Sequence, residues 1–150
     1  MPFARKIAQL RTLKRSITRF IGQSALKNSH IIEDAIKQDQ LFEKGIDGLG
    51  RSLGSYAPST IQYKTTLAGR LGNSTRIDHI TLKDTGAFYE SIKVKLQRDG
   101  LKIESEPQKE DTNLLEQFGE EILFLTPENF DDFQKNFLLD DLRTSIRAGL

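Results

Sequence analysis

The dipeptide Asp99 and Gly100 stands between two runs in which apolar and polar residues alternate, and this pattern constrains the fold more than any other. Asp-Gly between alternating runs is typical of a tight β-hairpin turn. The pattern predicts an antiparallel hairpin over about residues 92–104, with one apolar and one charged face. Because an isolated hairpin is only marginally stable, we expect other elements to cover its apolar face. The short apolar run at 122–125 predicts a buried strand over about residues 121–125.

Amphipathic helices are predicted at both ends of the chain. Within residues 1–27, apolar residues recur at steps of three and four, and Gly22 is expected to weaken or end the helix. This N-terminal stripe consists of Ile7, Leu10, Leu13, Ile17, Phe20 and Ile21. Near the other end, Thr126 suits a helix N-cap and Pro127 suits the first helical turn. The stripe of that helix consists of Phe130, Phe133, Phe137, Leu138, Leu142 and Ile146.

These elements predict an α+β fold, in which a small antiparallel β-sheet is flanked by N-terminal and C-terminal amphipathic helices, with long ordered loops. A chain of 150 residues is long enough to bury one core without disulfides or a metal. We therefore expect a single domain over residues 1–150. Its parts are a basic helix over 1–27 that can project from the body, a loop-rich insertion over 45–80 and a core over 81–150.

Shorter elements are predicted between the two ends. A helix is expected from Ser29 to about residue 44, with Ile32, Ile36, Leu41 and Phe42 facing inward. Four glycines at 45, 48, 50 and 54 predict a loop over 45–57, and a second loop is expected over 69–80. Between them, Pro58 suits the start of a short helix. Two further short helices are expected, one capped by Asp84 or Thr85 and one over about 112–118.

The composition excludes several classes of protein. Cysteine is absent, which excludes disulfides, thiolate metal sites and cysteine nucleophiles. The longest apolar run has four residues, far short of the roughly 20 that a membrane helix needs. We therefore predict no membrane partner and no export signal, which fits an intracellular protein or a virion protein. A targeting peptide and a membrane-surface helix stay open as alternatives for the basic N-terminus.

The net charge of +1 hides a strong separation of charge along the chain. Residues 1–32 hold seven basic side chains and no acidic ones, whereas residues 104–142 hold twelve acidic side chains and two lysines. Such separation predicts that the basic N-terminus contacts something negative: nucleic acid, the acidic end of the same fold, or the acidic end of a neighbouring copy. The candidate residues facing another subunit or DNA are Arg5, Lys6, Arg11, Lys14, Arg15 and Arg19.

Little in the sequence points to catalysis. The glycine-rich loop lacks the Gly-Lys-Ser/Thr of a phosphate-binding loop, and the two histidines, His30 and His79, have no metal-ligand spacing around them. We therefore predict no catalytic residue, no cofactor and no metal. Asp84, Thr85 and Gly86 form the tripeptide found around the catalytic aspartate of aspartic proteases, which need two such carboxylates. A hydrolase at Asp84 is the remote alternative, and a helix cap is the structural one.

The same segment resembles a family of tailed-phage morphogenesis proteins, the small minor-tail, tail-completion and head–tail joining proteins. Their loose signature reads Leu-x-x-Thr-Gly-x-Leu/Phe-x-x-Ser-Ile. This chain matches it at Leu82, Thr85, Gly86, Phe88, Ser91 and Ile92. Further on, Glu116, Phe118 and Gly119 are similar to the family's Glu-Phe-Gly element, with Gln117 inserted. An apolar pair and a C-terminal helix follow, as in the family.

The resemblance implies a non-enzymatic virion protein made in the host cytoplasm. It implies a ring at the head–tail junction, as a neck, connector, tail-terminator or tail-completion protein that joins head to tail around the DNA channel. The implied partners are copies of the chain itself and portal, neck or tail-tube proteins, with non-specific contact to packaged DNA. The alternative from another class is a DNA-associated adaptor that uses the basic N-terminal helix on nucleic acid.

Overall fold

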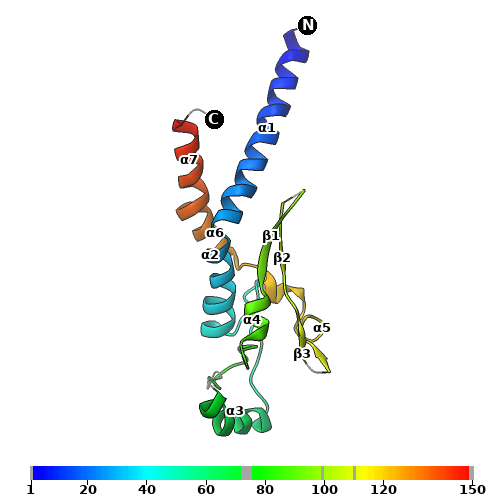
Figure 1. Cartoon of the computed structure of the whole chain (residues 1–150), viewed down its shortest axis with the longest axis vertical. Helices are drawn as coiled ribbons and strands as arrows, with labels where there is room; N and C mark the ends of the chain where they lie inside the picture. The colour runs from blue at the N-terminus through cyan, green and yellow to red at the C-terminus, as the bar shows by residue number, and fades with distance from the viewer. Residues whose placement is uncertain (1, 72–75, 99, 110, 149–150) are drawn as a thin grey trace.

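Helices dominate the fold, and a two-stranded hairpin lies beside them (Figure 1). The computed structural model describes residues 2–71, 76–98, 100–109 and 111–148. The N-terminal half contains α1 (Pro2–Lys27), α2 (Ser29–Asp34), the π-helix η1 (Ala35–Lys44) and α3 (Pro58–Leu71). The middle contains α4 (Ala87–Ser91), β1 (Lys93–Gln97), β2 (Gly100–Glu104), β3 (Gln108–Lys109) and β4 (Thr112–Asn113). The C-terminal part contains α5 (Leu114–Phe118), the 3₁₀ helix η2 (Glu120–Leu123), α6 (Pro127–Phe133), the π-helix η3 (Gln134–Leu138) and α7 (Leu139–Arg147).

The predicted hairpin is confirmed. Strands β1 and β2 pair antiparallel, with Val94 opposite Ile103 and Leu96 opposite Leu101. These four apolar side chains share one face because side chains alternate along a strand. Only Val94 is buried; Leu96 and Leu101 stay exposed. Of the predicted turn residues, Asp99 lies outside the described part of the chain.

The predicted strand over 121–125 is wrong. Residues 120–123 form the 3₁₀ helix η2, in which Ile122 and Leu123 are both buried. Consecutive strand residues point to opposite faces, so a strand would have turned one of these two side chains away from the core. A second short antiparallel ladder, β3 with β4, was not predicted. The α+β class is confirmed, and both sheets among the described residues are two-stranded.

The core gathers around the helix that α2 and η1 form together. Ile32, Ile36 and Leu41 are buried as predicted, and Phe42 is half-buried. The predicted bounds hold, but from residue 35 onwards the helix is wound as a π-helix. Gly45, with φ of 60°, ends it in the left-handed conformation. The other buried apolar residues come from several elements: Ala25, Phe88, Tyr89, Ile92, Val94, Leu114, Ile122, Leu123 and Phe133.

A buried glutamine connects this helix to the start of α6. The Gln40 side chain is fully buried, and its Nε2 donates to the Phe124 carbonyl at 2.8 Å. Its Oε1 accepts from the Thr126 backbone N–H at 2.8 Å and from the Asn129 side chain at 3.0 Å. Thr126 is the N-cap of α6, as predicted, and accepts from the Asn129 backbone N–H. Gln40 therefore holds the segment that leads into the C-terminal helix.

The glycine-rich loop after η1 is ordered around Asp47. One oxygen of this buried carboxylate accepts from the backbone N–H groups of Leu49 and Arg51, each at 2.9 Å. The other lies 2.7 Å from the Arg51 guanidinium. Gly48 donates its N–H to the Glu121 carbonyl at 2.8 Å, which ties the loop to η2. The predicted loop is therefore a folded part of the body.

Asp47 makes the stability of this loop depend on pH. Burial alone raises the pKa of the carboxyl, but hydrogen bonds from the Arg51 and Leu49 backbone and from the Arg51 side chain, with its charge, outweigh burial and hold the pKa below its usual value. A carboxyl whose pKa is lowered by folding stabilises the fold above its unfolded pKa, and this stabilisation is lost as the pH falls through the folded pKa.

We expect Asp47→Asn to lower the melting temperature at neutral pH, and the difference from wild type to shrink below about pH 4. Circular dichroism melts over a pH series measure both quantities. Asp111→Asn, at an exposed position, is the control and should follow the wild type throughout. A difference between Asp47→Asn and wild type that is independent of pH would assign the loss to packing instead of the ionised carboxyl.

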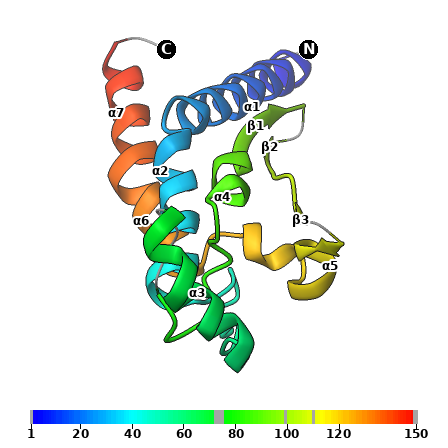
Figure 2. The ribbon, with the colours of Figure 1, turned by 60° about the horizontal axis from the view of Figure 1, so that its bottom comes forward.

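Helix α1 follows the predicted bounds of 1–27, and Gly22 lies inside it and does not end it. The glycine lies where the hairpin crosses the helix: a Cβ on Gly22 would stand 2.7 Å from Cδ1 of Leu96. The close contact with the hairpin, and not a helix end, thus accounts for a glycine at position 22. Beyond this crossing α1 leaves the body, and in Figures 1 and 2 its N-terminus and the end of α7 lie far apart, although the two helices meet near α2.

Candidate interaction surface

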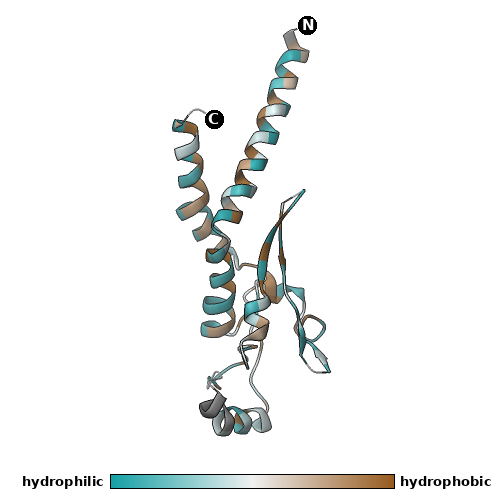
Figure 3. Cartoon of the chain, in the orientation of Figure 1, coloured by the Kyte–Doolittle hydropathy of each residue, from teal (hydrophilic) through white to brown (hydrophobic). Residues whose placement is uncertain are grey.

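Most of the apolar stripe of α1 is exposed in the described part of the chain, and of its residues Phe20 alone is half-buried there. Phe3 is 78% exposed, Leu10 65% and Leu13 56%, and Ile7, Ile17 and Ile21 are exposed as well. Figure 3 shows the brown segments of this stripe recurring along the projecting part of α1. Monomeric proteins seldom leave a contiguous apolar face of this extent in water. The stripe is therefore a candidate contact surface.

The base of α1 is fixed to α7 by a polar cluster. Ser24 and Asn28 both donate side-chain hydrogen bonds to one oxygen of Asp141, and Lys27 lies 3.5 Å from the other. The Ser24 hydrogen bond, with the Lys27 charge, holds the pKa of Asp141 below its usual value. This cluster is the vertex from which α1 and α7 diverge.

The six candidate cations on α1 form no ion pair with the described residues. Arg5, Lys6 and Arg11 are exposed, as are Lys14, Arg15 and Arg19. Of the seven basic residues in the N-terminal segment, Lys27 alone forms an ion pair with a described residue, Asp141. The hypothesis of charge matching within one fold thus accounts for Lys27 only. Nucleic acid and a neighbouring copy stay open for the other six.

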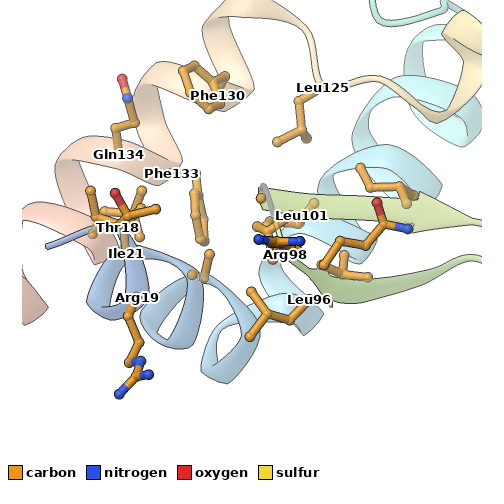
Figure 4. A pocket seen from close by; sticks show the side chains of 18 of the residues that line it. Thr18, Arg19, Ile21, Leu96, Arg98, Leu101, Leu125, Phe130, Phe133 and Gln134 are labelled. Atoms are coloured by element: carbon orange, nitrogen blue, oxygen red, sulfur yellow. The ribbon is translucent and has the colours of Figure 1, made fainter. Parts of the chain in front are cut away.

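A groove of about 1100 Å³ lies between α1, the hairpin and the start of the C-terminal helix. Its apolar floor is formed by Ile21 of α1, Leu96 and Leu101 of the hairpin, and Phe124, Phe130 and Phe133 beside them. Figure 4 shows Phe133 and Leu101 on opposite sides of this space. The sequence did not identify the groove, although the predicted apolar face of the hairpin was a signal for it, since that face needed cover.

The groove carries positive charge only. Its lining includes Arg11, Lys14, Arg15 and Arg19 from α1 and Arg98 from the hairpin tip, and no aspartate or glutamate among the described residues. Four of the six candidate cations therefore lie along this groove, whereas Arg5 and Lys6 lie on the projecting end. The groove thus combines an apolar floor with cations along its sides. This combination suits an amphipathic partner with acidic groups.

The residues of the phage-like motif pack and form hydrogen bonds in and around α4. Phe88 and Ile92 are buried, and the Ser91 hydroxyl donates to the Phe88 carbonyl while accepting from the Glu106 N–H. The predicted cap at Asp84 or Thr85 is wrong, because the N-cap is Gly86, with φ of 96°. Thr85 still accepts a hydrogen bond from the Ala87 N–H, just after this turn.

Leu82 of the same motif has a positive φ of 57°, which is uncommon for a residue with a side chain. The neighbouring Thr81 is held by two tyrosines: its N–H donates to the Tyr56 hydroxyl, and its carbonyl accepts from the Tyr89 hydroxyl. Burial, with Tyr56 nearby, raises the pKa of Tyr89, which therefore stays a donor. No sequence pattern pointed to this cluster.

The residues weighed for catalysis have other contacts. Asp84 lies 2.7 Å from the Lys109 ammonium, whereas a protease would need a second carboxylate sharing its proton. His79 bonds to Asp78 and to the Phe42 carbonyl, and His30 is exposed. Among the described residues, no three histidine, aspartate or glutamate side chains gather as metal ligands would. Among the described helices, none is long and apolar enough to cross a membrane.

Comparison of the chain with models of protein families, with curated proteins and with solved structures finds no match. The fold and this surface define an α+β protein with a projecting amphipathic helix and a positively charged apolar groove.

Proposed function

We propose that this chain is a non-enzymatic structural subunit of a tailed-phage virion, which forms a ring at the head–tail junction as a neck, connector or tail-completion protein. The observation that carries the proposal is the projecting half of α1, whose apolar stripe and cations lack a partner within the described residues. A helix of this kind buries its apolar stripe and pairs its charges by association with another molecule. The motif at 82–92, which resembles that of the phage proteins, supports the particular assembly.

Charge separation supports contact between copies. The six candidate cations of α1 form no ion pair with the described residues, while exposed acids such as Glu128, Asp132 and Asp140 lie on the C-terminal helix. A basic surface at one place and an acidic one at another suit a head-to-tail interface, and such interfaces close into rings. The partners in this proposal are copies of the chain and the portal, neck or tail-tube proteins beside the ring.

The double variant Leu10→Glu, Leu13→Glu tests the role of the stripe. Both side chains are exposed, so we expect the fold and melting temperature to be unchanged and self-association to be lost, because two carboxylates would be buried in the interface. Light scattering after size-exclusion chromatography gives the mass. The matched control is Gln9→Glu, Thr12→Glu, which adds the same charge to other faces of α1 and should assemble as the wild type does. Equal assembly of all three proteins would contradict the proposal.

Quantitative mass spectrometry of purified tailed particles from the source of this sequence tests the virion assignment. We expect about 6 to 12 copies per particle, the number in a closed ring. Hundreds of copies would make the chain a capsid or tail-tube component, and absence from the particles would refute a virion role.

A second candidate function is that of a DNA-associated adaptor, which the exposed cations of α1 favour. Binding through phosphate contacts weakens steeply with salt. If the chain binds duplex DNA with such a slope and the reversal of Arg11, Lys14 and Arg15 to glutamate abolishes binding, while the chain is absent from particles, the adaptor function is the better one.

A further inference from the structure

We propose that the groove between α1, the hairpin and the start of the C-terminal helix binds an acidic amphipathic helix from a different protein. The inference rests on the proposed function, because it names the partner class for one surface of the subunit. That surface is separate from the apolar stripe: most residues of the stripe lie outside the groove, and Ile21 alone belongs to both.

The floor of the groove calls for an apolar partner. Leu96 and Leu101 are 45% and 38% exposed although they face each other across a hairpin, and Phe124 and Phe130 are about half exposed. These four side chains belong to three parts of the chain and line one groove, in which Figure 4 shows Leu96, Leu101 and Phe130. Covering them would remove a contiguous apolar surface from water, which is the main source of affinity at such sites.

The dimensions favour a helix over a small ligand. The lining runs along α1 from Arg11 to Ala25, which at 1.5 Å per residue is about 21 Å, or about four helical turns. The groove of about 1100 Å³ is thus elongated along α1. An amphipathic helix laid in the groove along α1 matches this length.

The charge selects an acidic helix. Five cations line the groove, and no carboxylate lies among its described lining residues. A partner with acidic residues beside its apolar stripe would pair with these cations at the rim while its stripe covers the floor. A basic helix would be repelled by the same five charges.

The longer helices of this chain are not accessible acidic amphipathic helices. In the described part, α1 is basic and α3 has no acidic residue, while η1 is committed to the core and α6 forms a wall of the groove. On α7, Asp140 and Asp141 are balanced by Arg143 and Arg147, and Asp141 is already bonded to Ser24. None of these longer helices offers a free apolar stripe with a net negative charge, so we assign the groove to a helix of another protein and the contact between copies to the apolar stripe of α1.

The test measures binding of a labelled, designed helix of four turns, with leucine along one face and glutamate on the others, to the full-length chain by fluorescence anisotropy. Two control peptides are a version with lysine in place of every glutamate and a version of the same composition with the stripe scrambled. We expect the acidic helix to bind at least about tenfold more tightly than either control, and binding to weaken as salt is raised.

Variants of the chain locate the binding. Leu101→Glu places a carboxylate on the floor and is expected to weaken binding at least about tenfold, without loss of folding because the side chain is already exposed. The matched control is Gln23→Glu, which adds the same charge at an exposed position of α1 outside the groove. Replacing Arg11, Lys14 and Arg15 by glutamine should remove most of the salt dependence.

Several outcomes would overturn the inference. Equal binding of the three peptides, or equal effects of Leu101→Glu and Gln23→Glu, would show that the groove does not select an acidic helix. Loss of self-association in Leu101→Glu, with no binding of the acidic peptide, would assign the groove to a second copy. Preference for duplex DNA over the peptide, unaffected by Leu101→Glu, would assign its cations to nucleic acid. None of these depends on the Leu10 and Leu13 variants, so each proposal can fail without the other.

Discussion

Replacing Gln40 by leucine is expected to lower the free energy of unfolding by about 3 kcal/mol or more. Leucine has a similar volume but removes the hydrogen bonds of Gln40 to the Phe124 carbonyl, the buried Thr126 N–H and the Asn129 amide, of which the Asn129 amide keeps its bond to Asp39. Each such group costs about 1–3 kcal/mol when it is buried and unpaired. Because these partners precede or begin α6, the loss should loosen the attachment of the whole C-terminal helix.

Chemical denaturation measures this change, and hydrogen exchange locates it. We expect faster exchange of the amides at the start of α6 in Gln40→Leu than in wild type. Gln38→Leu is the matched control, since it makes the same chemical change at an exposed position of the same helix. Equal losses in both variants would mean that helix preference, and not the buried amide, sets the stability.

Replacing Gly48 by alanine is expected to cost about 3 kcal/mol, because the loop lies against η2 with no room for a side chain. A Cβ at this position would stand 2.4 Å from the Phe124 Cβ and 2.4 Å from its carbonyl oxygen. Backbone atoms cannot rotate away as the end of a side chain can, so the loop must move. Such movement would also stretch the hydrogen bond from the Gly48 N–H to the Glu121 carbonyl.

Gly50→Ala separates this effect from backbone strain. Gly50 has a φ of 76° but open space around it, so alanine there meets only the cost of the left-handed conformation, about 1–2 kcal/mol. Equilibrium unfolding of the two variants should therefore rank Gly48→Ala as clearly the less stable. The reverse order would mean that the loop moves freely from η2.

The elements that the sequence predicted correctly are those with a local physical cause. The hairpin follows from alternation around a turn dipeptide, and the start of α6 follows from a cap and a proline at Thr126 and Pro127. The misplaced strand at 121–125 has no such cause: four apolar residues in a row suit a strand, a helix or a 3₁₀ turn equally, and packing of Ile122 and Leu123 decides among them.

Tertiary contacts explain the remaining differences. Gly22 was expected to weaken or end the helix, but it lies inside α1 next to Leu96 of the hairpin, a contact that local sequence does not encode. Gln40 is polar in a helix and would be expected on the surface, yet it is buried because its partners come from residues 124–129. The candidate surface was predicted in part: the cations were identified, whereas the groove that four of them line depends on how distant segments meet.

Because the described residues hold α1 at its base, the projecting part can tilt as a rigid arm. The part beyond Gly22 spans about 20 residues, or about 30 Å. Over that length, a tilt of about 10° at the Asp141 vertex displaces the tip by about 5 Å. In the proposed ring, small rotations at the base of each arm would change the diameter or fit an uneven neighbour without deforming the core of any subunit.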